Sequence, residues 1–350
     1  WVFFWNSGDG GRLRFGTYGD NIQTTTSTWT AGVWYHIQAV VTSTNTANIY
    51  VNGRLDTYNS DSDISTDPIN GNQDTVINIG LSRVAAGDLY FNGLIDDIRF
   101  YNYARSPAQI AWEYNHGKPI AWYKMDESSW ANDCSSDTVM DSSLNDNHGR
   151  SCPSGTGPTG GASGKFNNSG SFDGTNDYIQ IPDSSELRLT SSGTISLWVN
   201  PNSLPTSGWK VLLSKGDWGG GLNNFSIYYV GSNSNLRFDL AGSTTPPNII
   251  QISNSYTPVG SWTHIVSTWD GSTIRLYING KQISSTTQTK TPNTTGYDLY
   301  VGTAQGSASY VFDGKIDDVR LFNYSLDANQ VKLLFNENST IRFGPALGNP

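Results

Sequence analysis

The chain of 350 residues has few charged side chains, and the excess among them is acidic. Charged residues make up 15% of the sequence, with 21 Lys and Arg against 30 Asp and Glu and a formal net charge of -9. Without a basic stripe, the chain cannot displace the counterions that surround phosphates. It also lacks an apolar run of about 18 residues, the length that a membrane-spanning helix needs. We therefore predict no nucleic-acid partner and no membrane-spanning segment.

Cysteine is almost absent as well. The only two, Cys134 and Cys152, lie in one loop-like stretch. An even and sparse count is typical of exported proteins, so we predict a Cys134–Cys152 disulfide and a location outside the cell or on its surface. Closing a loop of this size stabilises a fold by roughly 3 kcal/mol. The alternative interpretation is a pair of free thiols.

Aromatic and small polar residues are abundant instead. Phe, Trp and Tyr make up 12% of the chain, which also contains 37 Gly. Aromatic side chains suit a pleated surface, and small polar residues suit turns. Residues 194–199 and 273–278 alternate as half-buried strands do. Asn52-Gly53 and Asn279-Gly280 follow such runs and predict tight hairpins, because both turn residues must take positive φ. The sequence therefore predicts an all-β fold.

The sequence also repeats itself. Phe91–Tyr103 (FNGLIDDIRFYNY) returns as Phe312–Tyr324 (FDGKIDDVRLFNY), and the segments before each block return in the same order. The offset drifts only from 228 to 221 residues, which indicates a duplicated domain rather than a short solenoid repeat. Residues 1–118 match roughly residues 225–340. We therefore expect the chain to open in the middle of a domain.

These matches divide the chain into three parts. Residues 1–118 are interpreted as the C-terminal part of a domain, residues 119–338 as a complete domain, and residues 339–350 as a tail. Each copy is predicted to end in one short helix. Ser106 is the expected N-cap of the first helix, and Ser325 is expected to open the second.

A series of short motifs in the second copy points to a known family. In order, they are Ala121–Glu127 (AWYKMDE), Asp141–Gly149, Gly170–Ile179 (GSFDGTNDYI), Gly193–Val199 (GTISLWV), Trp262–Val266, Tyr277–Gly280 and Gly314–Asn323. This series resembles the laminin G-like domains of the concanavalin A-like lectin/glucanase superfamily. The resemblance is complete over about residues 120–338 and covers residues 1–118 as a half domain. It implies two antiparallel jelly-roll β-sandwich domains.

The resemblance also implies a structural calcium ion. In related glucanases, a final strand reading Asp-x-Val-Arg places its first Asp on calcium, and Asp317 matches that position. Calcium prefers six to eight carboxylate and carbonyl oxygens, and the expected neighbours are Asp126, Asp173 and the carbonyl of Gly174. Asp96 is the matching residue of the first copy. The alternative is that Asp317 only accepts hydrogen bonds from turn backbone.

Glycosidase chemistry is not expected, because it needs two carboxylates placed on either side of one bond. Glucanases of this superfamily carry them in a Glu-x-Asp-x-(x)-Glu cluster on one strand. The chain has four Glu, and none forms such a cluster: Glu113, Glu127, Glu186 and Glu337. We therefore predict no catalytic residues and no enzyme activity.

A ligand site is predicted in the stretch around Trp218. Asp217 precedes this Trp, and Asn223 and Asn224 follow a run of Gly. An aromatic face beside amide and carboxylate groups suits sugar stacking and recognition of hydroxyls. The alternative is that Trp218 caps the edge of the sandwich.

These observations favour a noncatalytic extracellular adhesion module that binds glycans or surface proteins. Two alternatives stay open, a structural subunit of a surface filament or sheath and an accessory binding module of a larger glycan-degrading enzyme. A half domain exposes an apolar sheet face and unpaired strand edges, which invites self-association. Either polypeptide upstream completes that domain, or strands from another molecule do so.

Overall fold

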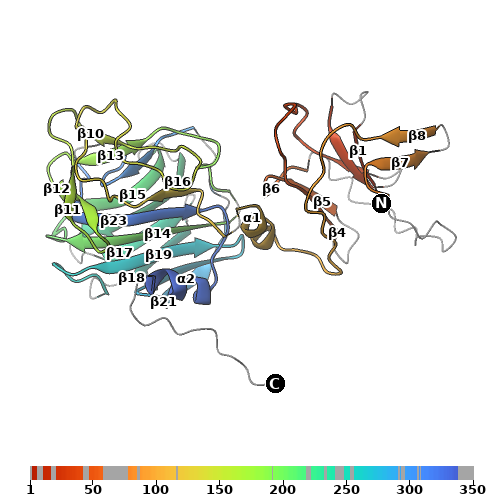
Figure 1. Ribbon diagram of the computed structural model, residues 1–350. Coiled ribbons are helices and arrows are strands. Elements are labelled where there is room, and N and C mark those ends of the chain that lie inside the picture. Colours follow the sequence, from red (N-terminus) through yellow and green to blue (C-terminus); the bar gives the residue numbers. More distant parts are fainter. Residues whose placement is uncertain are drawn as a thin grey trace, which may run out of the picture. The chain divides into compact units, whose positions relative to one another are not determined.

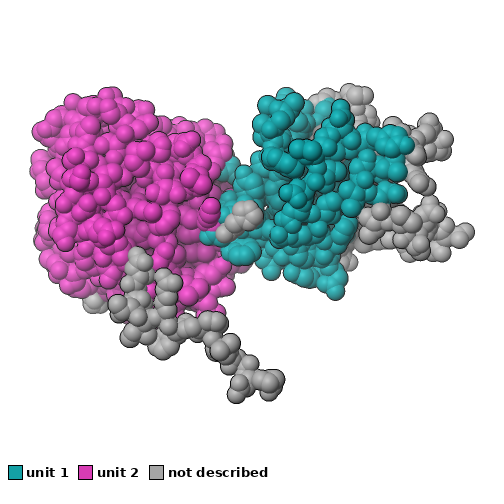
Figure 2. All heavy atoms as spheres, in the orientation of Figure 1, with its two compact units in different colours: residues 1–117 teal, residues 118–350 magenta. Residues whose placement is uncertain are grey.

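The computed structural model divides into two compact units, residues 1–117 and residues 118–350, which Figure 2 draws in different colours. It describes residues 2–5, 11–16, 21–41, 47–57, 78–84, 87–115, 117–190, 192–217, 222–231, 235–240, 248–252, 256–290, 292, 296–305, 307 and 309–337. The predicted tail falls outside these residues. No helix in the described part is long and apolar enough to cross a membrane.

Unit 2 consists of two antiparallel sheets (Figure 1). The eight-stranded sheet has the order β11 (Thr159–Ser163), β12 (Asn168–Asp173), β23 (Asp313–Phe322), β14 (Gly193–Pro201), β19 (Thr263–Trp269), β20 (Thr273–Ile278) and β21 (Lys281–Thr287), and β9 (Ala121–Tyr123) also pairs with β23. The seven-stranded sheet has the order β10 (Arg150–Cys152), β13 (Tyr178–Ile181), β22 (Leu299–Val301), β15 (Trp209–Asp217), β16 (Leu222–Val230), β17 (Asn235–Leu240) and β18 (Asn248–Ile252).

Apolar residues at alternate positions of both sheets form one core. Trp269 of β19 contacts Phe225 of β16 and Phe238 of β17, with ring centroids 6.1 and 5.8 Å apart. These rings belong to a single buried cluster that draws on both sheets. The arrangement is a β-sandwich, so the predicted all-β class is confirmed.

Unit 1 is built from short antiparallel strands. One sheet contains β1 (Val2–Trp5), β2 (Leu13–Gly16) and β3 (Asn21–Gln23). A second contains β4 (Ile37–Val41), β5 (Ala47–Val51) and β6 (Arg54–Leu55), and a hairpin joins β7 (Leu81–Val84) to β8 (Gly87–Tyr90). Ile22 of β3 packs in one cluster with Ile49 and Val51 of β5.

The two units reproduce the same local structure at the predicted hairpins. Asn52 and Asn279 both have positive φ, 49° and 50°, as the Asn-Gly turn requires. Each Asn side chain accepts a hydrogen bond from the backbone of a histidine. His36 N donates to Asn52 Oδ1 at 3.0 Å, and His264 N donates to Asn279 Oδ1 at 2.9 Å. The duplication seen in the sequence is therefore also a duplication in structure.

Strand register repeats as well. Arg14 of β2 pairs with Gln23 of β3, and Arg237 of β17 pairs with Gln251 of β18. Phe4 of β1 occupies the place of Tyr228 in β16, since each pairs with the corresponding Arg. Unit 1 thus aligns with unit 2 from β16 onward.

Each unit ends in a short helix with a capping box. In α1 (Pro107–Asn115), Gln109 N donates to Ser106 Oγ at 3.2 Å and Ser106 N donates to Gln109 Oε1 at 2.9 Å. In α2 (Ala328–Phe335), the N-cap is Asp327, whose carboxylate accepts from Gln330 N at 2.9 Å. The prediction that Ser325 opens this helix was wrong, because the Asp327 carboxylate satisfies the first free N–H groups two residues later.

The two cysteines form a disulfide within unit 2. Cys134 and Cys152 lie 18 residues apart in sequence, with Cα atoms 4.7 Å apart. The bond ties the loop before β10 to the last residue of that strand. Gln180 of the neighbouring strand β13 lies beside both sulfur atoms.

Candidate functional site

The face of the seven-stranded sheet that points away from the core carries a continuous row of polar side chains. Gln180, Tyr300, Ser214, Ser226 and Asp239 are successive cross-strand partners in β13, β22, β15, β16 and β17. Directly opposed residues project to the same face of a sheet. We call this row, with its neighbours Tyr178, Asn224, Tyr228 and Arg237 on the same strands, the polar sheet face.

One end of the polar sheet face is an ion-paired cluster. Tyr228 Oη donates to Asp239 Oδ2 at 2.5 Å, and Arg237 Nε donates to Asp239 Oδ1 at 3.1 Å. The Arg237 guanidinium also lies 5.6 Å from the centre of the Tyr228 ring. Desolvation raises the pKa of Asp239, although both hydrogen bonds oppose the shift. These three side chains stabilise one another.

The middle of the face holds polar groups without partners. Within the described part of the chain, neither the side-chain oxygen nor the nitrogen of Asn224 has a hydrogen-bond partner, and Ser226 Oγ has none either. Both residues are fully buried. An unmet amide in a protein interior costs roughly 1–3 kcal/mol, so such groups are usually matched by ordered water or by a ligand.

The other end of the face is aromatic. Tyr178 of β13 and Tyr300 of β22 are partly exposed, with ring centroids 6.0 Å apart. Gln180 stands directly opposite Tyr300 and two residues after Tyr178 in β13. Its Nε2 donates a hydrogen bond to Asp298 Oδ2 at 2.6 Å. That bond fixes the orientation of the Gln180 amide next to the two rings. Burial raises the pKa of Tyr300 to about 12, so its hydroxyl stays protonated and can donate a hydrogen bond.

The structure brings only part of the predicted ligand site to this face. Asn224 lies on it, and Asp217 and Asn223 lie at the end of the hairpin formed by β15 and β16. Trp218 falls outside the described residues. Sequence analysis missed Tyr178 and Tyr300, although Tyr178 begins a short alternating run and Tyr300 stands between Leu299 and Val301.

The strand register separates Asp173 and Gly174 from Asp317, the first of the predicted calcium ligands. The register of β12 and β23 pairs Gly170 with Ile316 and Asp173 with Asp313. Asp173 therefore lies four residues along the ladder from the partner of Asp317, roughly 13 Å away. Gly174 lies at the same end as Asp173, against Asp313.

The Asp317 carboxylate instead accepts a hydrogen bond from the backbone of a turn. Its Oδ2 accepts a hydrogen bond from Phe166 N at 2.9 Å, and Asp126 Oδ1 accepts from Asn168 N at 3.3 Å in the same turn. Burial raises the pKa of Asp317 to about 7. This geometry agrees with the alternative in which Asp317 accepts hydrogen bonds from turn backbone.

The described residues hold no group of three or more His, Cys, Asp or Glu side chains placed to bind a metal ion. In unit 1, Asp96 is exposed and its Oδ1 accepts from the adjacent Asp97 N at 2.8 Å. Calcium binding at Asp317 or Asp96 therefore stays a prediction from the family resemblance.

A serine and a histidine make contact on the other sheet, among packed aromatic rings. Ser196 Oγ lies 2.8 Å from His264 Nε2. His264 stacks on Trp198 and on Phe335 of α2, with centroids 4.9 and 6.1 Å apart. Burial lowers the pKa of His264 to about 3. Its Nδ1 has no partner in the described residues, so no carboxylate orients the ring as a catalytic base would require.

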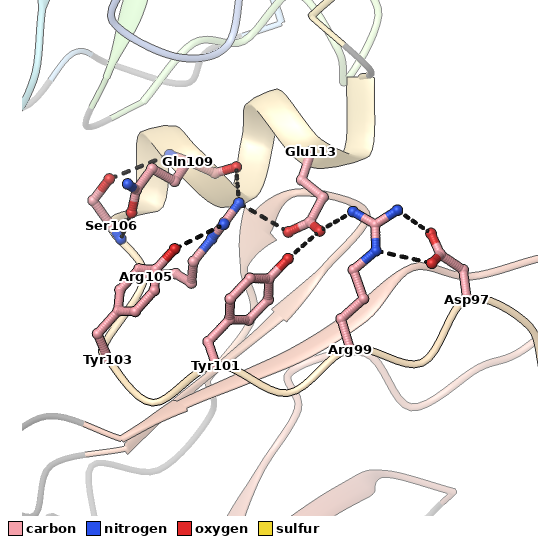
Figure 3. A network of polar contacts seen from close by, with 8 residues as sticks. All are labelled: Asp97, Arg99, Tyr101, Tyr103, Arg105, Ser106, Gln109 and Glu113. Carbon is pink, nitrogen blue, oxygen red and sulfur yellow. Dashed lines mark hydrogen bonds and ion pairs between the residues drawn. The ribbon is translucent and has the colours of Figure 1, made fainter. Parts of the chain in front are cut away.

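The glutamates have structural contacts. Glu113 pairs with Arg99 and Arg105 (Figure 3), and Glu337 pairs with Arg320. Glu127 accepts hydrogen bonds from Trp130 Nε1 at 3.0 Å and from a backbone N–H. The fourth, Glu186, accepts a hydrogen bond from Ser185 Oγ at 3.0 Å.

Solved structures resemble the chain in fold. Domain 4 of AbnA, a GH43 extracellular arabinanase from Geobacillus stearothermophilus solved with arabinotriose, is 23% identical, with a TM-score of 0.48 over 62% of this chain and 98% of that domain. The receptor-binding domain of botulinum neurotoxin mosaic serotype C/D is 13% identical, with a TM-score of 0.48 over 63% of this chain. The match spans 51% of that domain, about half its length.

The binding domain of Paraclostridial Mosquitocidal Protein 1 is 17% identical, with a TM-score of 0.47 over 64% of this chain and 53% of that one. Comparison with curated protein sequences finds no match. A family model, by contrast, matches residues 1–111 and residues 173–332. These two segments are the two copies of the repeat. The chain therefore belongs to the concanavalin A-like lectin/glucanase superfamily.

Proposed function

We propose that the chain is a noncatalytic glycan-binding module of an exported or cell-surface protein, and that unit 2 binds sugar on the polar sheet face. The proposal rests on two neighbouring features of the polar sheet face. The buried side-chain amide of Asn224 has no hydrogen-bond partner among the described residues, and the rings of Tyr178 and Tyr300 lie side by side. Sugars present both chemistries, an apolar ring face and a rim of hydroxyl groups. Membership of a superfamily of lectins and glucanases agrees with this ligand class.

The two ends of the face have different roles in this proposal. Tyr178 and Tyr300 pack against the apolar faces of pyranose or furanose rings. The Asn224 side chain has an NH2 group that donates and a carbonyl oxygen that accepts. Sugar hydroxyls can both donate and accept, so either group of Asn224 can bond one. The Tyr228–Arg237–Asp239 cluster is already satisfied internally and keeps the far side of the face rigid.

The same contacts argue for binding without hydrolysis. Every glutamate is used in an ion pair or hydrogen bond elsewhere, and Asp239 is held by Tyr228 and Arg237. A glycosidase needs a second carboxyl group about 5–10 Å across a reachable bond. The polar sheet face offers amides and hydroxyls there, which recognise a sugar and leave its glycosidic bond intact.

Titration of the full chain against a glycan array tests the proposal. Asn224→Ala should weaken binding of any captured glycan by roughly 5- to 150-fold, the equivalent of the 1–3 kcal/mol lost with a buried hydrogen-bonding group. Tyr300→Ala should abolish stacking and weaken binding at least as much.

Trp34→Ala is the matched control, because Trp34 is an exposed aromatic residue of unit 1. It should leave glycan binding unchanged. The proposal is rejected if the array shows no binding, or if binding survives both substitutions on the polar sheet face.

A further inference from the structure

The outer surface of the seven-stranded sheet continues past Tyr228 to a second row of side chains. Trp209 of β15, Val230 of β16 and Asn235 of β17 are successive cross-strand partners. Val230 stands two residues after Tyr228 in β16, so this row projects to the same side of the sheet as Tyr228. Val230 also stands four residues after Ser226. The second row therefore lies roughly 13 Å from the first row, which crosses β13 to β17 through Ser226.

The second row carries an aromatic pair. Trp209 is 39% exposed, and the partly exposed Tyr310 lies beside it with ring centroids 5.6 Å apart. Tyr310 belongs to the segment between β22 and β23, and its carbonyl oxygen accepts a hydrogen bond from Val211 N at 2.8 Å. That bond fixes the backbone of Tyr310 beside β15, so the two rings are held together from two different segments.

A separate apolar cluster supports the aromatic pair. Val211, Tyr228 and Ala304 are buried in it, and Val230 and Tyr310 pack against them. The core between the two sheets, as far as the structure describes it, includes none of these five residues. Aromatic rings that rest on a packed base lose little further freedom when a ligand stacks on them.

The third member of the second row provides a polar group without charge. Asn235 is partly exposed, and its side-chain amide forms no hydrogen bond within the described part of the chain. Lys210 stands opposite Tyr229, a residue of the core, and so projects toward the other side of the sheet. Aromatic rings beside a neutral amide suit an uncharged sugar, which has an apolar ring face and hydroxyl groups.

Two residues that follow β22 lie between the two rows. Ser214 Oγ, in the first row, donates a hydrogen bond to Thr303 O at 3.0 Å. The next residue, Ala304, is buried in one cluster with Val211 and Tyr228, a cross-strand pair that stands between the rows. A sugar ring stacked on one aromatic pair therefore does not reach the other.

We propose that Trp209, Tyr310 and Asn235 form a second sugar-binding site, so that unit 2 binds neutral glycans at two separate points of one sheet face. The ligand class rests on the proposed function, because both sites combine an aromatic pair with an amide. Two strand spacings, roughly 10 Å, separate Trp209 from Asn235, and Val230 lies between them. A sugar ring stacks on Trp209 while its hydroxyl groups bond the Asn235 amide. A polymeric glycan that occupies both sites gains avidity without any new contact.

Titration of the full chain with neutral trisaccharides tests the proposal, with cellotriose, xylotriose and mannotriose as the probes. A trisaccharide that binds should saturate at two molecules per chain in the wild type and at one in Trp209→Ala. The substitution should weaken the second site on the order of 10-fold, since it removes the stacking surface. Asn235→Ala should weaken the same site by roughly 5-fold. Trp209→Phe, which keeps an aromatic face, should lose much less.

The NMR signal of the Trp209 indole N–H gives a second measurement, and its absence from Trp209→Phe assigns it. The signal should shift when the trisaccharide is added to the wild type. It should shift equally in Tyr300→Ala, because that substitution removes stacking at the first site only. Trp112→Ala is the matched control, since Trp112 is an exposed aromatic residue of α1, and it should leave the stoichiometry unchanged.

The proposal is overturned if the wild type binds one trisaccharide, or if Tyr300→Ala abolishes the shift of the Trp209 signal. Either result leaves sugar binding at the first row standing. If none of the three trisaccharides binds, the second site is rejected as well, and the glycan array decides the first site by itself.

Discussion

The buried carboxyl group of Asp317 gives a prediction that separates its two sequence-based interpretations. Burial raises the pKa of Asp317 from 3.8 to about 7 in the folded chain. Between these values the folded state binds a proton that the unfolded state has released, so the free energy of unfolding falls as pH rises. A shift of about 3 units corresponds to roughly 4 kcal/mol as an upper bound.

Asp317→Asn mimics the protonated carboxyl and keeps an oxygen that can accept from Phe166 N. The variant should unfold with nearly the wild-type free energy at pH 4. At pH 8 it should be more stable than the wild type by up to about 4 kcal/mol. Exchange of β14 amides during urea unfolding reports on unit 2 alone, and comparison with the wild type at each pH cancels the other titrating groups.

Asp96→Asn is the matched control, because Asp96 is the exposed counterpart of Asp317 in unit 1. It should change the stability of unit 2 by less than about 0.5 kcal/mol at either pH. A result in which Asp317→Asn destabilises at pH 8, and calcium stabilises only the wild type, would refute the turn-acceptor interpretation. Asp317 would then be the metal ligand expected from the family resemblance.

Two further predictions concern the stability of unit 2. Lys215 is fully buried and donates from Nζ to Asp183 Oδ1 at 2.6 Å, so Lys215→Met should destabilise by roughly 3–5 kcal/mol in urea unfolding because it leaves a buried carboxylate short of a partner. Lys210→Met on the same strand should have little effect, and equal losses in both variants would count against the ion pair. Reduction of the Cys134–Cys152 bond should lower the free energy of unfolding of unit 2 by roughly 3 kcal/mol, measured with and without reductant, whereas an unchanged midpoint would contradict this value.

Local chemistry explains which features could be predicted from the sequence. The Asn52-Gly53 and Asn279-Gly280 hairpins depend only on residues that tolerate positive φ, and both have it in the structure. The capping box of α1 depends on two side chains three residues apart, Ser106 and Gln109. Such features are set within a few residues and can be read without knowing the fold.

Features set by strand register could not be predicted in this way. Tyr178 and Tyr300 are distant in sequence and meet only because β13 pairs with β22. The calcium prediction placed Asp173 beside Asp317 from the order of strands alone. Strand order alone does not bring the two carboxylates together, because the register of β12 and β23 leaves them four residue positions apart along the ladder.

The Asn-Gly turn of each unit also carries the final helix. A Cβ atom at Gly53 would lie 3.1 Å from the Tyr114 ring, and one at Gly280 would lie 3.1 Å from the Phe335 ring. The turn and the helix therefore pack closely, and a larger side chain in place of the glycine would displace the helix. When such modules are shuffled between genes, a helix exchanged without its own hairpin will dock poorly, so viable crossovers should fall beyond the helix, in the linker between modules.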